Sequence, residues 1–201
     1  MSNHTYPGEQ DMTTSTTTAD LEQLTGTYDI DPAHSSLEFA AKHAMVTTVR
    51  GRFSDFTGVI HIDGRNPESS SAEVNVKIAS IDSRSEQRDE HLRSADFFDA
   101  EKHPEMTFKS TRAAAGKRDG QWRMWGDLTI KGVTREIELE LDYTGSAVDP
   151  WGGARVGFEG HATLNRKDWG LVWNVALEAG GLLVSEKVKL NLDIAAVKRA
   201  E

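Results

Sequence analysis

The stretch Glu136–Tyr143, EIELELDY, decides the fold of this chain because its apolar and charged residues alternate one by one. Successive side chains of a β-strand point to opposite faces of a sheet, so this stretch predicts one apolar face and one wetted face. The same alternation recurs at Glu73–Ile78 and Lys187–Ile194. Such one-sided strands are typical of antiparallel sheets, which cover a core with one face and meet water with the other.

Most of the chain continues in this pattern, with turns rich in Gly, Asp and Pro between the apolar runs. The expected strands are 26–31, 35–44, 50–63, 71–81, 105–114, 121–131, 133–144, 154–165 and 184–198. Long strands joined by short turns favour a mainly all-β domain, an antiparallel up-and-down barrel of about eight strands, because closure removes exposed sheet edges. A barrel of about eight strands can hold one slender ligand, so an internal apolar channel is expected.

One segment departs from the strand pattern, the charged stretch Ser83–Ser110. Ser83 precedes Glu86 by three residues, and this capping-box spacing predicts a short helix that begins there. Such a helix has too few apolar residues to be stable alone, so we expect it to lie as a flap on the barrel. The residues expected on its solvated face are Arg88, Asp89, Glu90 and Arg93. The residues expected to face the barrel are Leu92, Phe97 and Phe98.

The composition limits the domain organisation and the partners. The chain has 201 residues, a net charge of -9 and no cysteine. This excludes thiolate chemistry and disulfides, and the acidic balance argues against nucleic acid. We expect residues 1–24 to form a disordered, Thr-rich tail and residues 25–199 to form one barrel domain. No apolar run could span a bilayer, and the first residues do not resemble a signal peptide, so the expected location is cytoplasmic.

The sequence contains no recognisable catalytic or metal-binding motif, which favours a protein that is not an enzyme and has no metal site. Two polar residues nevertheless stand out. His43 shares its alternation with Phe39, so it would be either a hydrogen-bonded core histidine or a contact for a ligand headgroup. Arg166 would belong either to a polar turn or to an anion-binding rim at the barrel mouth. Trp169 and Trp173 would pack in the core, line a cavity, or do both.

Several segments, in order and at fitting intervals, resemble the YceI-like family from about Tyr28 to Lys198. They are Asp31–Phe39, Lys42-His43, Val49–Phe53, Arg88–Ser94, Asp96–Phe98, Pro104–Phe108, Gly126–Thr134 and Asn165–Leu171. The resemblance implies an extended, lipocalin-like barrel with helical pieces that binds a long amphiphile in an apolar channel. It also implies a homodimer, and no cofactor other than a bound polyisoprenoid-like or fatty-acyl ligand.

The resulting hypothesis is binding, sequestration or transport of a polyisoprenoid or fatty-acyl lipid inside the barrel. The headgroup would lie near His43 and Arg166. The channel walls would be the inward-facing apolar residues Phe39, Phe53, Val76, Phe108, Leu128 and Leu139. One alternative is a cavity enzyme acting on a small isoprenoid or lipid, with His43 as general base and Asp127 or Asp168 as its acidic partner. Another is a structural homodimer whose barrel is filled by side chains.

Overall fold

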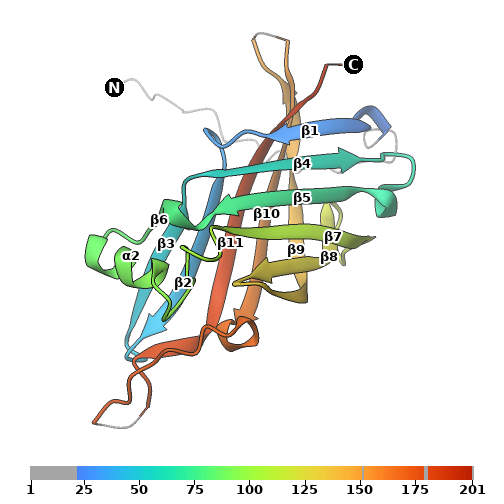
Figure 1. The fold of residues 1–201 in the computed structure, drawn as a ribbon. Helices are drawn as coiled ribbons and strands as arrows, with labels where there is room; N and C mark the ends of the chain where they lie inside the picture. The colour runs from blue at the N-terminus through green and yellow to red at the C-terminus, as the bar shows by residue number, and fades with distance from the viewer. Residues whose placement is uncertain (1–21, 151, 179–180, 201) are drawn as a thin grey trace, which may run out of the picture.

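The computed structural model describes residues 22–150, 152–178 and 181–200. Eleven strands and a few short helices make up this part of the chain (Figure 1). The strands are β1 Gly26–Ile30, β2 Ser36–His43, β3 Thr47–Phe53, β4 Phe56–Ile62, β5 Ser71–Lys77, β6 Ile81–Asp82, β7 Glu105–Ala115, β8 Gln121–Ile130, β9 Val133–Val148, β10 Ala154–Asn165 and β11 Val184–Lys198. The helical segments are η1 Pro67–Ser69, η2 Ile78–Ser80, α2 Glu86–Arg93 and η3 Arg166–Trp169.

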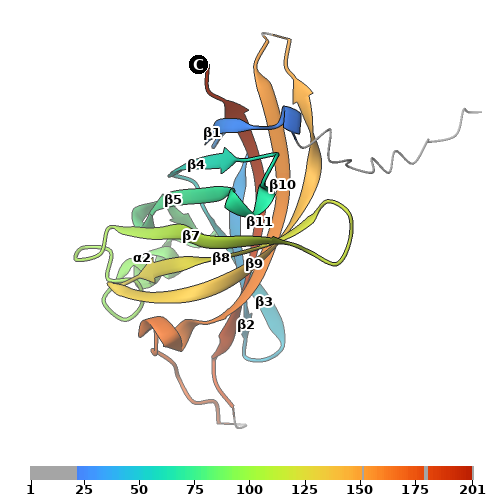
Figure 2. The same ribbon diagram turned by 90° about the vertical axis from the view of Figure 1, so that its right-hand side faces the viewer.

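Eight of these strands close into an antiparallel barrel, which confirms the predicted fold. The strand order is β1-β4-β5-β7-β8-β9-β10-β11, and β11 returns to pair with β1. Strand β11 is forked along its second edge, because Val184–Asp193 pairs with β2 while Ala196–Lys198 pairs with β1. Strands β2, β3 and β6 therefore form a branch that extends from the barrel (Figures 1 and 2).

Two predicted strands are each divided in the structure. The expected strand 50–63 is split into β3 and β4 at Ser54 and Asp55. The break moves the chain from the branch into the barrel, because β3 pairs with β2 and β6 whereas β4 pairs with β1 and β5. The expected strand 71–81 is likewise divided into β5, η2 and β6. The alternation changes phase at each break, since the buried residues Phe53 and Phe56 are three positions apart, as are Ile78 and Ile81. This shift marks the breaks but does not reveal the new pairing partners.

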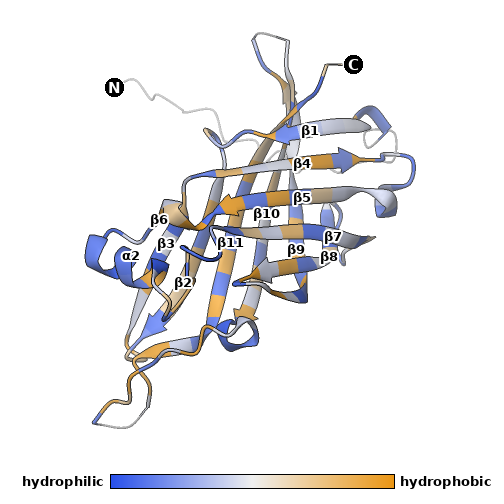
Figure 3. Ribbon diagram, in the orientation of Figure 1, coloured by the Kyte–Doolittle hydropathy of each residue, from blue (hydrophilic) through white to orange (hydrophobic). Residues whose placement is uncertain are grey.

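The inward faces of the strands form one apolar interior with two buried clusters. In β9, Ile137 and Leu139 are buried while Glu136 and Glu140 are exposed, as the alternation predicts. Figure 3 shows the same alternation of apolar and polar residues along several strands. The predicted tail boundary is wrong at Leu24, which is buried in one cluster and accepts a hydrogen bond from the Tyr28 hydroxyl through its carbonyl oxygen (2.8 Å). Residues 1–21 of the predicted tail lie outside the described residues.

A polar network at Asp31 joins two distant parts of the barrel. The Asp31 carboxylate accepts a hydrogen bond from the Arg155 guanidinium (2.7 Å) and also bonds the ring of His34 (2.8 Å). Arg155 donates in addition to Asp149 in the β9–β10 connection (3.1 Å). Chiefly through Arg155, and secondly through His34, the pKa of Asp31 is lowered from 3.8 to about 2. The ionised form of Asp31 therefore stabilises the folded state.

This network gives stability an acid-sensitive component. Because the pKa of Asp31 is lower in the folded chain, its contribution of about 2 kcal/mol is present above about pH 4 and is lost as the pH falls toward 2. The free energy of unfolding of the parent protein, measured with urea, should therefore fall between pH 5 and pH 2. We expect a smaller fall in Arg155→Gln, because that variant lacks the main cause of the lowered Asp31 pKa. Arg199→Gln is the control, since its bond to Asp29 is exposed and is expected to contribute little. Parallel pH profiles for the parent and Arg155→Gln would contradict this explanation.

Candidate ligand-binding cavity

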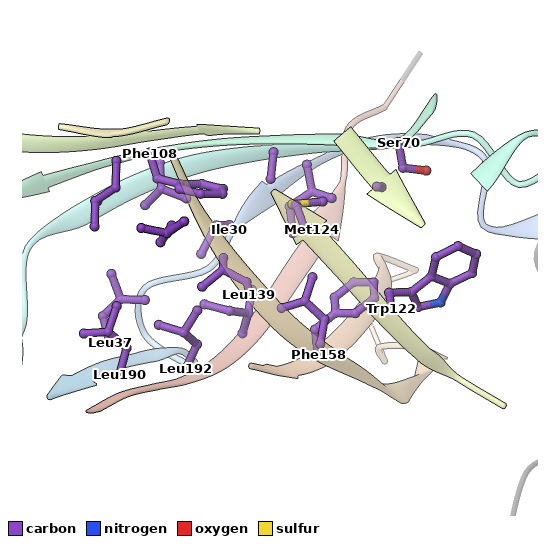
Figure 4. A pocket seen from close by; sticks show the side chains of 18 of the residues that line it. Ile30, Leu37, Ser70, Phe108, Trp122, Met124, Leu139, Phe158, Leu190 and Leu192 are labelled. Atoms are coloured by element: carbon purple, nitrogen blue, oxygen red, sulfur yellow. The ribbon is translucent and has the colours of Figure 1, made fainter. Parts of the chain in front are cut away.

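The barrel encloses an apolar cavity with a volume of about 200 Å³. One buried water needs about 10–15 Å³ by the same measure, so this space far exceeds a packing defect. Its wall is made almost entirely of aliphatic and aromatic side chains that point inward from the strands (Figure 4). The interpretation of a barrel filled by side chains is therefore wrong, and the interior has room for a ligand.

All six predicted wall residues lie on the cavity wall. They are Phe39, Phe53, Val76, Phe108, Leu128 and Leu139. They occupy inward positions on six different strands, β2, β3, β5, β7, β8 and β9, as the alternation within each strand predicts. Their contact with a ligand stays a prediction.

Other wall residues were missed, although the same alternation could have identified several of them. The missed wall residues include Ile30, Leu37, Trp122, Met124, Leu141, Tyr143, Phe158, Leu190 and Leu192. Leu190 and Leu192 lie on the apolar face of β11, and Leu141 and Tyr143 continue the face of Leu139. Phe158 faces Tyr143 across the β9–β10 pair, with ring centroids 5.6 Å apart.

The flap lies over one end of the cavity. Leu92 and Phe98 pack against both buried clusters but do not line the cavity themselves. The ring of Phe98 meets that of Phe53 edge-on, at a centroid distance of 6.0 Å. Phe53 in turn contacts Phe39 (5.8 Å). The flap thus packs behind the cavity wall: Phe98 contacts the wall residue Phe53 but does not line the cavity itself.

The predicted capping box and the wholly solvated charged face of the flap are wrong. The residue at the helix N-cap is Ser85, and the Ser83 side chain bonds elsewhere. Asp89 is only 7% exposed, and its carboxylate accepts hydrogen bonds from the Ser83 backbone N–H (2.9 Å) and the Ser83 hydroxyl. Arg88 donates to the Ser83 hydroxyl (2.7 Å) and carbonyl (2.6 Å). These charged groups hold the helix to the preceding strand.

Arg166 is placed differently from the predicted anion-binding rim. It is 6% exposed and does not line the cavity. Its guanidinium donates to the backbone carbonyls of Leu171, Ser185 (2.9 Å) and Val184 (3.4 Å). Burial lowers the pKa of Arg166, and the Glu186 carboxylate opposes that effect. Arg166 therefore anchors the chain at Leu171 and at Val184-Ser185, and its donors face backbone oxygens rather than the interior.

The two tryptophans after Arg166 belong to the packed end of the barrel rather than to the cavity wall. Trp169 is buried, and its indole N–H donates to the Leu128 carbonyl (2.9 Å). Trp173 packs against Phe97 (5.3 Å between centroids) and the ring of His91 (4.6 Å). Phe97 is buried in the same cluster, so these aromatic rings connect the flap to the segment that follows η3.

The predicted catalytic alternative has no support in the geometry of the described residues. His43 is exposed at the end of β2 and does not line the cavity, so its expected inward position is wrong. Asp127 and Asp168 are exposed as well, and among the described residues neither bonds to His43. In the same ranges, no group of three His, Asp or Glu side chains could hold a metal ion. No helix there is long and apolar enough to cross a membrane.

The family model of the YceI-like domain matches residues 28–196. The chain belongs to the YceI-like family. A UPF0312 protein of Vibrio cholerae is 43% identical over 143 residues, covering 71% of this chain and 75% of the relative. The crystal structure of a Campylobacter jejuni YceI protein has a TM-score of 0.68 and 30% identity, over 79% of this chain and 90% of that one. A domain from Saccharophagus degradans described as polyisoprenoid binding has a TM-score of 0.64 over 86% of this chain and 98% of that domain, and its 17% identity shows the fold alone.

Several YceI-like segments of the sequence hold the fold together in this chain rather than form the cavity wall. Asp31, just after β1, bonds Arg155 of β10, and Arg88 and Asp89 fix the flap. Arg166 bonds the backbone of Leu171, Val184 and Ser185. The apolar positions of other segments, such as Phe39, do line the cavity. The charged residues that are most conspicuous in the sequence are thus poor guides to the ligand site.

Proposed function

We propose that the chain binds a long-chain amphiphile, a polyisoprenoid or a fatty-acyl lipid, in the barrel cavity and acts as a carrier or sequestering protein. The observation that carries the proposal is a closed barrel with an apolar cavity of about 200 Å³. The Saccharophagus degradans domain of the same fold, described as polyisoprenoid binding, gives independent support.

The energetics of an apolar wall suit this role. Each methylene that leaves water for such a wall contributes about 0.8 kcal/mol. Burial of about ten methylenes would supply roughly 8 kcal/mol before the costs of binding, which corresponds to micromolar affinity. The wall alone can therefore provide useful affinity, and a non-catalytic role needs no further chemistry. A cytoplasmic location and a homodimer stay predictions, to be tested by cell fractionation and sedimentation.

The test is extraction of the protein purified from a native host, followed by mass spectrometry of the organic phase. We expect one amphiphile in near-stoichiometric amount. Val74→Trp, which places an indole into the cavity from β5, should reduce the bound lipid at least about tenfold by removing free volume. Glu73→Trp is the matched control, because Glu73 is the exposed neighbour of Val74 on the same strand. Absence of a stoichiometric amphiphile, or equal lipid in Val74→Trp and the parent, would refute the proposal.

A further inference from the structure

Most of the exposed apolar side chains gather at one end of the molecule. Among the described residues six large apolar side chains are exposed, and five of them belong to the β2–β3 turn or to the segment 171–185. These five residues, which form the apolar tip, are Met45, Val46, Val172, Val175 and Leu182. The two segments lie side by side, because the Leu183 carbonyl accepts a bond from the Ala44 N–H (2.7 Å) and the Leu183 N–H donates to the Val175 carbonyl (2.9 Å). Figures 1 and 2 show both projecting from the bottom of the molecule.

The β2–β3 turn exposes its apolar side chains at a cost in backbone free energy. Ala44 and Met45 both have a positive φ (49° and 59°), and the Val46 N–H donates to the His43 carbonyl (3.1 Å). Two consecutive positive φ angles are typical of a type I′ hairpin turn, in which Asn-Gly is the preferred pair. Met45 is 66% exposed and Val46 is 79% exposed, so neither gains stability from burial in the folded chain. Residues that strain the turn without packing in the fold indicate a partner outside the chain.

The outer surface beside the apolar tip is cationic, although the chain has a net charge of -9. Its exposed cations are Lys42, Arg50, Lys187 and Lys189. Arg50 and Lys189 both pair with Ala40 and so share one face of β3, β2 and β11. Lys42 and Lys187 lie on that face two residues nearer the tip. None of the four forms an ion pair with a described residue. The segments 39–53 and 171–185 together contain a single acidic residue, Glu178.

The same outer surface becomes acidic away from the apolar tip. Glu38, Glu159 and Asp193 are exposed there and border a hollow on the barrel. Charges in water act over about 8 Å at physiological ionic strength, so a surface that meets the tip is governed by the nearby cations. An anionic surface would therefore attract the tip and repel the rest of the molecule. This distribution favours an upright orientation in which the apolar tip makes the contact.

We propose that the apolar tip docks the protein on the surface of an anionic lipid bilayer. Its five side chains enter the headgroup layer, where their apolar surface leaves water, and the four cations stay at the level of the lipid phosphates. Projecting apolar side chains beside unpaired cations match the two attractions that such a bilayer offers, a hydrophobic layer beneath a negative one. The proposal concerns the outer surface and does not depend on what the cavity holds.

Flotation of the full-length protein with lipid vesicles tests the docking. Vesicles of phosphatidylcholine with about one-third phosphatidylglycerol are compared with vesicles of phosphatidylcholine alone, at low and at high salt. We expect binding to the anionic vesicles to be at least about tenfold tighter and to weaken as salt is added, because each cation near the surface raises binding several-fold and is screened by salt. No binding to the anionic vesicles, or equal binding to both compositions, would overturn the proposal.

Substitutions in the β2–β3 turn separate docking from folding. Ala44→Asn/Met45→Gly supplies the preferred pair of the turn, so it should raise the urea midpoint of unfolding and yet weaken vesicle binding at least about threefold. Val46→Asp should weaken vesicle binding at least about tenfold. Val148→Asp is the matched control, because Val148 is also exposed (71%) but ends β9 at the opposite end of the molecule (Figure 1). Unchanged binding by Val46→Asp, or an equal loss in Val148→Asp, would overturn the proposal.

Charge variants and sedimentation test the choice of a bilayer as the partner. Lys42→Gln/Arg50→Gln should weaken binding to the anionic vesicles at least about tenfold. Arg112→Gln/Lys117→Gln, which changes the net charge equally on β7 and the turn that follows it, should have little effect. Equal losses in the two double variants would contradict docking by the tip. A dimer of the parent that Val46→Asp converts to monomers, with no binding to the anionic vesicles, would assign the tip to an interface between copies and overturn the proposal.

Discussion

Replacement of Asp89 by alanine is expected to lower the free energy of unfolding by about 3 kcal/mol, because it leaves two buried donors without an acceptor. The donors are the backbone N–H and the hydroxyl of Ser83, which is itself only 3% exposed. The Ser83 hydroxyl, which accepts a hydrogen bond from Arg88, would lose its own acceptor. Urea unfolding, followed by tryptophan fluorescence, measures the change directly.

The neighbouring residue provides the control for Asp89. Glu90→Ala, on the same helix and exposed, is expected to change the free energy of unfolding by less than about 0.5 kcal/mol. The double variant Ser83→Ala/Asp89→Ala should lose less free energy of unfolding than the two single variants lose together. Removal of the Ser83 hydroxyl also removes one of the donors that Asp89→Ala leaves unpaired. If Asp89→Ala proved as mild as Glu90→Ala, the buried network would not hold the flap.

The second large effect is expected at Arg166. Arg166→Leu should destabilise the fold by about 3 kcal/mol, because hydrogen bonds from a charged group are worth about 1.5–3 kcal/mol each and several carbonyls lose their donor together. These carbonyls belong to Leu171, Val184 and Ser185. We therefore expect faster amide hydrogen exchange across the 171–185 segment than elsewhere in the barrel. Mass spectrometry of exchanged peptides would locate it.

Two further variants separate geometry from charge at this site. Arg166→Lys keeps the charge but not the planar array of donors. Its loss of unfolding free energy should therefore be smaller than that of Arg166→Leu but still measurable. Lys167→Leu removes the neighbouring pair with Glu186, which is about 40% exposed on both side chains. That loss should stay below about 1 kcal/mol. Equal destabilisation by Arg166→Leu and Lys167→Leu would contradict the anchoring role.

The sequence was sufficient for the barrel and for part of its wall because both depend on alternation alone. A side chain such as Leu139 must point inward if its strand is part of a closed barrel, whatever its neighbours are. The change of pairing partner between β3 and β4 could not be predicted in this way. Pairing depends on contacts between residues far apart in the chain, such as Tyr28 with Ile60. The alternation changes phase between Phe53 and Phe56, which marks a break but does not identify the new partner strand.

The charged residues were harder to place from the sequence. Asp89 and Arg166 lie in polar stretches, so local composition predicts exposure for both. Their burial depends on partners that only the folded chain supplies, namely the Ser83 N–H for Asp89 and backbone carbonyls for Arg166. His43 shows the opposite error, since its alternation is correct but β2 extends beyond the cavity before His43 is reached.

Because β11 is forked, its two edges contribute very different numbers of residue pairs to the closure of the barrel. Strand β10 meets β11 over eleven residue pairs, whereas β1 meets it over three, from Tyr28↔Lys198 to Ile30↔Ala196. The bond between Asp29 and Arg199 beside this short seam is exposed and adds little. Because local opening follows the segment with the fewest backbone bonds, the wall can part at β1 while the rest of the barrel stays intact. Leu24, just before β1, lines the cavity, so the weakest seam lies next to the ligand space.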